Sequence, residues 1–257
     1  MSTEQSKIEL KKLTEQVSIV LSKKGVAPTV MVQVGFATDV SGSIEGSYLD
    51  GTMQNIVNRL QALSNRFDDN QTLDMWAFHN GVIELEPAVP SMFGSYVKDY
   101  ILSRSDLWGG TSFVPVLEMV RDHYFGGITE KPVTGHIPPA TGFFKSIFSS
   151  REEPKPTITE SVVKGNGVKL PVYLIFLTDG DNDDTKATDQ LISDLQTENI
   201  YIQMVGVGRG STFRFIKGLA AKYDHVGFVD FSDPSKVTDE QMYAALLNDE
   251  FVNWLKK

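Results

Sequence analysis

Oxygen-bearing side chains occur in three short segments whose spacing could serve to hold a divalent cation. In the first segment, Asp39, Ser41 and Ser43 alternate directly after an apolar run. Alternate residues of an extended segment point to the same side, so their oxygens can face one site. A second segment supplies Thr111 after two glycines, and a third supplies Asp179 just after another apolar run. These residue types favour coordination of a hard metal ion by oxygen.

Mg²⁺ is the cation that we expect at this site, with Mn²⁺ or Ca²⁺ as alternatives. Mg²⁺ requires nearly octahedral oxygen coordination and commonly keeps water molecules among its ligands. Serine and threonine hydroxyls are neutral, and two carboxylates acting largely through water compensate the charge of the ion only in part. The remaining coordination position should therefore favour a carboxylate that arrives from another molecule.

The elements that must position these segments alternate between strands and helices. Strands are predicted at 30–38, 73–78, 82–85, 172–177, 200–207 and 226–231. Helices are predicted at 51–67, 96–102, 114–124, 185–196 and 213–221, with a final helix opened by a capping box at Thr238 and Gln241. The predicted fold class is α/β, a doubly wound and mostly parallel sheet with helices on both faces.

Four further features of the predicted fold bear on the site. The pair Asn80-Gly81 favours a hairpin, so the strand at 82–85 should run antiparallel to its neighbour. Ligands of such sheets gather where the carboxyl ends of the strands meet, which is where the candidate cation ligands lie. Gly109 and Gly110 are expected to give the loop of Thr111 freedom to move. Asp181, Asp183 and Asp184 are interpreted as N-terminal residues of the next helix rather than as ligands.

The chain is expected to have two parts. Residues 1–27 should form an N-terminal amphipathic helix, which ends at Gly25 and buries one apolar stripe. That stripe consists of Leu10, Leu13, Val17, Val20 and Leu21. Residues 28–257 should form one α/β domain with a long insertion at about 126–169, rich in proline and glycine. The insertion is interpreted either as a surface embellishment or as a partner-docking loop led by its aromatic cluster, Phe143, Phe144 and Phe148.

Composition narrows the class of protein. The 257 residues include no cysteine, so disulfides and thiolate metal sites are excluded, and a reducing, cytoplasmic setting is expected. No window has the apolar length of a signal peptide or a membrane span. The 24 Lys and Arg residues face 33 Asp and Glu residues, a net charge of −9, which disfavours nucleic acid as a partner.

The segments DVSGSIEGSY, WGGTSFVPV and PVYLIFLTDGDNDD, in this order, resemble the metal-ion-dependent adhesion site of von Willebrand factor A (vWA) domains. Within that family the chain is most similar to the bacterial tellurium-resistance (Ter) and stress-response branch. The resemblance covers about residues 30–231, interrupted by the insertion. It implies that Ser41, Ser43 and Thr111 bind the ion directly, and that Asp39 and Asp179 hold coordinating waters. Ile44 stands where the family often has methionine.

The resemblance implies a cation-dependent protein-binding module in tellurite resistance or stress response, with a partner that offers an acidic side chain. Neither catalytic residues nor an organic cofactor is expected.

The alternative is a metal-dependent phosphatase or phosphotransferase with Asp39 as nucleophile, but that chemistry would require a second carboxylate where Ser41 stands. A scaffold without metal function is a further alternative. A dinucleotide site is disfavoured because Ser211 replaces the last glycine of the fingerprint. The sequence leaves the oligomeric state open.

Overall fold

A computed structural model describes residues 3–68, 70–126, 170–180, 182–208 and 213–257 of the chain. The described residues form a six-stranded sheet in the order β3-β2-β1-β4-β5-β6. Its strands are β1 (Gln33–Asp39), β2 (Leu73–Phe78), β3 (Val82–Glu84), β4 (Val172–Thr178), β5 (Ile200–Val207) and β6 (Val226–Phe231). Neighbouring strands pair in parallel except β2 and β3, which form the predicted antiparallel hairpin. The predicted fold class is confirmed.

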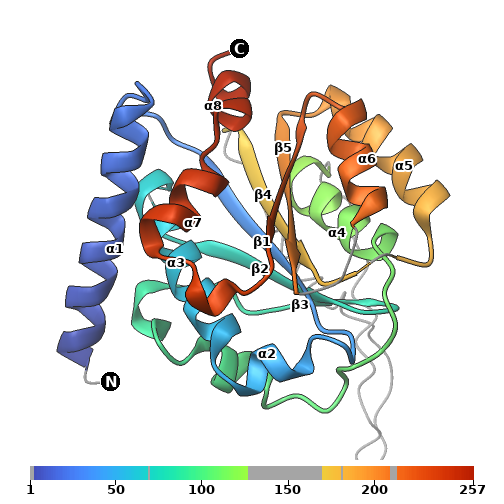
Figure 1. The fold of residues 1–257 in the computed structure, drawn as a ribbon, viewed down its shortest axis with the longest axis horizontal. Coiled ribbons are helices and arrows are strands. Elements are labelled where there is room, and N and C mark those ends of the chain that lie inside the picture. Colours follow the sequence, from blue (N-terminus) through green and yellow to red (C-terminus); the bar gives the residue numbers. More distant parts are fainter. Residues whose placement is uncertain (1–2, 69, 127–169, 181, 209–212) are drawn as a thin grey trace, which may run out of the picture.

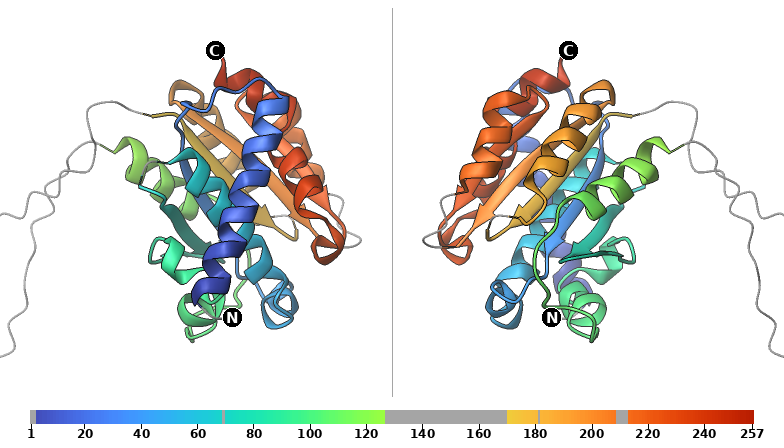
Figure 2. Two further views of the ribbon diagram at one scale, coloured as in Figure 1. Left: turned by 90° about the vertical axis from the view of Figure 1, so that its left-hand side faces the viewer. Right: turned by 90° about the vertical axis from the view of Figure 1, so that its right-hand side faces the viewer.

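Two helix layers cover the sheet, one on each face (Figure 1). Helices α3 (Thr52–Phe67) and α7 (Asp239–Leu246) lie on one face, and α4 (Val114–Phe125), α5 (Thr185–Asp194) and α6 (Arg214–Lys222) lie on the other (Figure 2). Two separate clusters of buried apolar side chains fill the spaces between the sheet and these layers. Every residue of β4 and of β5 is buried, because both faces of these central strands are covered. The burial explains why their sequences are nearly continuous apolar runs.

The N-terminal helix α1 (Thr3–Lys23) packs on α3 and α7 at the outside of the first layer (Figure 1). Its five predicted apolar residues are all buried. Asn65 of α3 donates a side-chain hydrogen bond to the Thr14 hydroxyl at 3.1 Å, which adds a polar contact to this apolar interface. None of the described helices has both the length and the apolar composition needed to cross a membrane.

The structure differs from the predicted elements in three places. A short helix, α2 (Glu45–Leu49), follows β1 and was not predicted. The segment predicted as an ordinary helix at 96–102 contains a π-helical turn, η2 (Val97–Ile101). The predicted final helix is two helices, α7 and α8 (Asp249–Leu255), because the Asn248 side chain accepts a hydrogen bond from the Phe251 amide at 2.9 Å and starts a new helix.

Short 3₁₀ turns complete the described part of the chain: η1 (Pro90–Met92), η3 (Leu195–Thr197) and η4 (Pro234–Lys236). The capping box at the start of α7 forms as predicted, with Thr238 and Gln241 each bonding the backbone amide of the other. The predicted insertion lies almost entirely outside the described residues, which stop at Gly126 and resume at Leu170.

Candidate metal centre

Asp39 lies at the carboxyl end of β1, beside the end of β4, and its side chain is completely buried. One carboxylate oxygen, Oδ1, accepts a hydrogen bond from the Ser41 amide at 2.7 Å. The other, Oδ2, accepts one from the Thr178 hydroxyl at 2.8 Å. Both oxygens are therefore held in place by the ends of two neighbouring strands.

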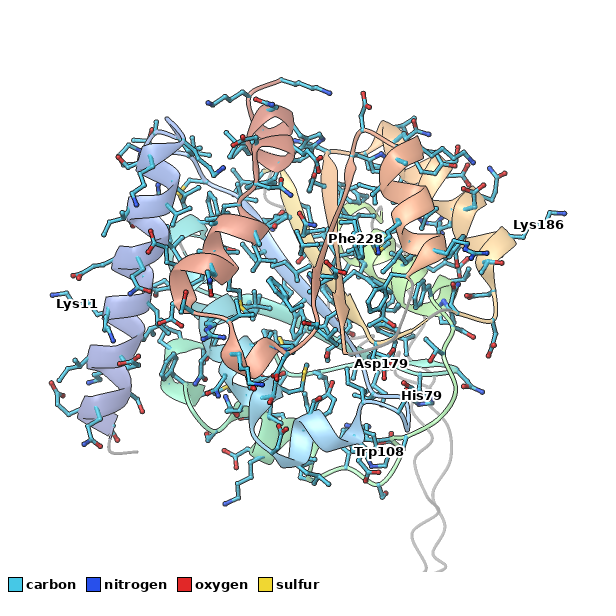
Figure 3. The ribbon with its side chains drawn as sticks, viewed as in Figure 1. Lys11, His79, Trp108, Asp179, Lys186 and Phe228 are labelled. Atoms are coloured by element: carbon cyan, nitrogen blue, oxygen red, sulfur yellow. The ribbon has the colours of Figure 1, made fainter. Side chains whose placement is uncertain are left out.

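A chain of hydroxyl and carboxylate groups leads from this buried residue toward the surface. Ser41 Oγ lies 3.2 Å from Ser43 Oγ, and Ser43 Oγ donates a hydrogen bond to Asp179 Oδ1 at 3.0 Å. Ser41 is buried, whereas Ser43 is exposed and Asp179 is half-buried. The structure thus brings four of the predicted ligands, Asp39, Ser41, Ser43 and Asp179, to one edge of the sheet. Figure 3 labels Asp179 at this edge.

The charges of this cluster suit a cation. Burial raises the pKa of the Asp39 carboxyl, the hydrogen bonds from Ser41 and Thr178 lower it in part, and the negative charge of Asp179 raises it further. A divalent cation next to both carboxylates would remove this repulsion. Within the described residues no group of three or more His, Cys, Asp or Glu side chains is placed to hold a metal. The donor set is instead hydroxyl-rich, with two carboxylates, and it fits a hard ion that retains water.

The loop of Thr111 lies against this cluster through its backbone. The Gly109 carbonyl accepts a hydrogen bond from the Gly42 amide at 3.2 Å, and the Trp108 amide donates to the Val40 carbonyl at 2.9 Å. The Thr111 carbonyl accepts a bond from the Asp183 amide at 2.9 Å. Thr111 therefore lies between the loop that follows β1 and the loop that follows β4. All of these contacts are made by the backbone of the loop.

The two glycines of this loop allow close packing. A Cβ atom at Gly109 would lie 2.9 Å from His79 Nδ1, and one at Gly110 would lie 2.5 Å from Asn80 Oδ1. A side chain at either position would require His79 or Asn80 of the hairpin that follows β2 to shift. Close packing is thus one reason for glycine here, and the expected freedom of the loop to move stays a prediction. The adjacent Trp108 has a φ of +67°, a conformation that few non-glycine residues adopt.

Asp184 joins two loops of the site, a role that the sequence analysis did not predict. It precedes α5 as expected, but its carboxylate accepts hydrogen bonds from the Phe113 amide at 3.0 Å and the Val114 amide at 2.8 Å, at the start of α4. Partial burial raises the pKa of Asp184, but these bonds and those from Asn182 and Thr188 outweigh it, so the pKa is lowered. Asp184 therefore ties the loop that carries Asp179 to the segment that carries Thr111. Asp181 lies outside the described residues.

Tyr48 and Thr178 are further site residues that sequence reasoning missed. The Tyr48 hydroxyl donates to the Asp39 carbonyl at 2.7 Å and lies 2.7 Å from the Thr38 hydroxyl. Tyr48 belongs to the unpredicted helix α2, and its ring packs edge-on against Trp108, with centroids 5.5 Å apart. Spacing along the sequence indicates none of these contacts, although Thr178 stands next to a predicted ligand.

Two solved structures illustrate the similarity of the fold to known proteins. The chain aligns with a von Willebrand factor type A protein from Catenulispora acidiphila, with 13% identity and a TM-score of 0.53, over 85% of this chain and 43% of that one. It also aligns with proximal thread matrix protein 1 from the mussel byssus, a form described as having a zinc-occupied MIDAS motif, the metal-ion-dependent adhesion site. There the identity is 16% and the TM-score 0.53, over 85% of this chain and 46% of that one. The chain spans less than half the length of either protein. The fold is that of a vWA domain.

The family model described as "vWA-TerF-like: vWA found in TerF C terminus" matches residues 31–134 and 144–257. Because this match covers more than half of the sequence, the chain belongs to the vWA-TerF-like family. A Bacillus subtilis (strain 168) protein, "Uncharacterized protein YcbR", is 29% identical over 254 residues, which are 97% of this chain and 87% of that protein.

Proposed function

We propose that this protein is a protein-binding module that depends on a divalent cation, and that it is not an enzyme. In this proposal Ser41, Ser43 and Thr111 bind Mg²⁺, or Mn²⁺ or Ca²⁺, directly, and Asp39 and Asp179 act through water. An open coordination position accepts an acidic side chain of a partner protein. The observation that carries the proposal is the continuous series of oxygen donors from buried Asp39 to Asp179 at the carboxyl edge of the sheet.

The charge of the donor set supports an external carboxylate as the last ligand. Hydroxyl groups leave most of the cation's charge uncompensated, so an anionic group from a partner is favoured there. The zinc-occupied MIDAS motif named for the mussel protein is consistent with a metal at this place in the fold. The family name supports a role beside other Ter proteins, and we propose tellurite resistance or stress response as the setting.

The phosphatase or phosphotransferase alternative is less well supported by the geometry. A nucleophilic carboxylate needs an oxygen that can reach the substrate, but Asp39 is completely buried and both of its oxygens accept hydrogen bonds. The position two residues on, where such chemistry would place an acid, is Ser41. We therefore propose that Asp39 positions the residues of the site and does not form a covalent bond with a substrate.

A comparison of protein capture with and without metal tests the proposal. The immobilised protein is incubated with a bacterial lysate in Mg²⁺ or in EDTA, beside an Asp179→Ala variant. We expect proteins that are retained by the wild type in Mg²⁺, released by EDTA and not retained by the variant. A parallel assay with p-nitrophenyl phosphate should show no turnover. Capture that is insensitive to EDTA, or metal-dependent hydrolysis that Asp39→Asn abolishes, would contradict the proposal.

A further inference from the structure

The outward face of α1 carries two exposed apolar side chains. Among the described residues, Ile8 is 60% exposed, Ile19 is 54% exposed, and Leu49 of α2 is the third exposed large apolar residue. Ile8 and Ile19 are close to three helical turns apart, so they lie on the same face of α1. Single apolar residues on a surface are ordinary, but a pair on one helix face is a place where another apolar surface can pack.

Charged residues complete this face of the helix. They lie within about 60° of the two isoleucines around the helix axis, and the buried apolar residues of α1 lie on the opposite side. In the left view of Figure 2, α1 runs along the near side of the molecule. We call the exposed residues of this face the outer stripe: Glu4, Ile8, Lys12, Glu15, Ile19 and Lys23.

The order of the outer stripe is complementary to its own reverse. A second copy of α1, placed antiparallel, can bring its Ile19 against Ile8, and its Ile8 against Ile19. The charged residues that then face one another have opposite signs throughout: Glu4 with Lys23, and Lys12 with Glu15. Two-fold symmetry produces each of these pairs twice. A parallel copy would instead place every charge against its own sign.

Existing contacts of the outer stripe are weak enough for a second copy to replace. Lys12 lies 3.9 Å from Glu9, and Lys23 lies 3.3 Å from Glu240. All four side chains are at least 40% exposed, and such exposed pairs contribute little to stability. Glu15 and Ile19 also border an open groove of about 590 Å³ beside α1, into which side chains of a second copy can pack.

The charge of α1 differs from that of the whole chain. The helix contains four lysines and three glutamates, a net charge of +1, whereas the chain carries −9. Two copies of an acidic protein repel one another over most of their surfaces. The helix is therefore a part of the surface where this repulsion is absent and where complementary charges can face one another.

We propose that two copies of this chain associate through the outer stripe of α1, as an antiparallel helix pair with two-fold symmetry. The helix has 21 residues and is about 30 Å long, so the interface lies at the small end of specific interfaces and the dimer dissociates on dilution. The outer stripe includes no residue of the candidate metal centre. The proposal is therefore independent of the proposed function, and the dimer presents two such centres.

Sedimentation velocity of the full chain from about 5 to 500 µM, the range that suits a weak interface, tests the association. We expect the wild type to change from monomer to dimer. Ile8→Gln with Ile19→Gln should raise the Kd of the dimer at least about tenfold, because the apolar contacts are lost. Leu49→Gln, a change of the same kind outside the stripe, should leave it unchanged. A wild type that stays monomeric, or a dimer that the isoleucine variant does not weaken, would overturn the proposal.

Complementary charge variants test the pairing of the charges. Lys12→Glu with Lys23→Glu makes the charged positions of the stripe wholly acidic, and Glu4→Lys with Glu15→Lys makes them wholly basic. Each variant alone should remain monomeric, and an equimolar mixture of the two should dimerise. Circular dichroism checks that both are folded, as expected for exposed positions. A mixture that stays monomeric would contradict the proposed pairing.

Disulfide trapping tests the antiparallel arrangement. The chain has no cysteine, so an introduced cysteine is its only thiol. A mixture of the Ile8→Cys and Ile19→Cys proteins should form a disulfide-linked dimer under mild oxidation. Either protein alone should form little, because its two cysteines would lie about 16 Å apart, beyond the reach of a disulfide. Equal cross-linking in the single proteins and in the mixture would show that the helices do not pair in this way.

Discussion

The two carboxylates of the candidate centre have different surroundings and therefore different tasks. Asp39 is buried and accepts bonds from Ser41 and Thr178, so it organises the ends of β1 and β4. Asp179 is half-buried and accepts a bond from the exposed Ser43. Its charge raises the pKa of Asp39, so the two groups oppose one another when no cation is near. Of the two carboxylates, that of Asp179 can therefore be removed without leaving a gap in the buried core.

Replacing Asp179 with alanine should abolish measurable Mg²⁺ binding and leave the metal-free protein folded. The lost hydrogen bond to Ser43 costs about 1 kcal/mol of the free energy of unfolding, and relief of the repulsion with Asp39 offsets it. Isothermal titration calorimetry measures the first effect, and thermal melting in EDTA measures the second. A control substitution, Asp194→Ala, should leave metal binding unchanged. Strong destabilisation of the metal-free variant would show that Asp179 is structural and that its assignment to the ion is wrong.

At the scale of elements, the loop between β4 and α5 connects the parts of the site. One end of this loop carries Asp179, and the other binds the start of α4 through the Asp184 carboxylate. Between them, the Asp183 amide donates to the Thr111 carbonyl. The distance between Asp179 and Thr111 is therefore set by hydrogen bonds between loops that are more than fifty residues apart in sequence.

Asp184→Asn should weaken both α4 and the metal site. The amide group would place a donor where the Phe113 or Val114 amide now finds an acceptor, which lowers the free energy of unfolding by about 1–2 kcal/mol. We expect the Mg²⁺ affinity to fall severalfold, because Thr111 is held less firmly.

Calorimetry and urea unfolding measure the two effects of Asp184→Asn. Asp183→Asn is the matched control, since Asp183 is exposed and its substitution keeps the backbone bond to Thr111. Equal Mg²⁺ affinities in the two variants would refute a positioning role for Asp184.

For the whole molecule, metal binding should stabilise the folded state. A ligand that binds only the folded state stabilises it by about 2.7 kcal/mol at a concentration one hundred times its Kd. In a domain of this size that corresponds to a rise of roughly 5–10 °C in Tm. Differential scanning fluorimetry in increasing Mg²⁺, with Asp179→Ala as the control that should not respond, measures the rise. A wild-type Tm that stays constant up to millimolar Mg²⁺ would contradict the proposal that the folded protein binds this metal.

Local patterns in the sequence determined the identity and order of most elements, because strand and helix periods are set by which side chains face the core. The buried stripe of α1, the antiparallel hairpin and the capping box of α7 were predictable in this way. The convergence of Asp39 and Ser41 with Asp179 followed from the rule that ligands gather at the carboxyl ends of parallel strands. The roles of these residues toward a metal stay predictions.

Only the tertiary structure decided which residues hold those side chains in place and what lies beside them. Tyr48 reaches the Asp39 carbonyl, Asp184 caps a helix other than its own, and Gly109 packs against His79. The break between α7 and α8 and a small cavity beside Ser43 likewise join distant segments. No repeating pattern along the sequence indicates these contacts, because each depends on the distance between residues far apart in sequence. That distance exists only after the sheet and its helix layers have packed.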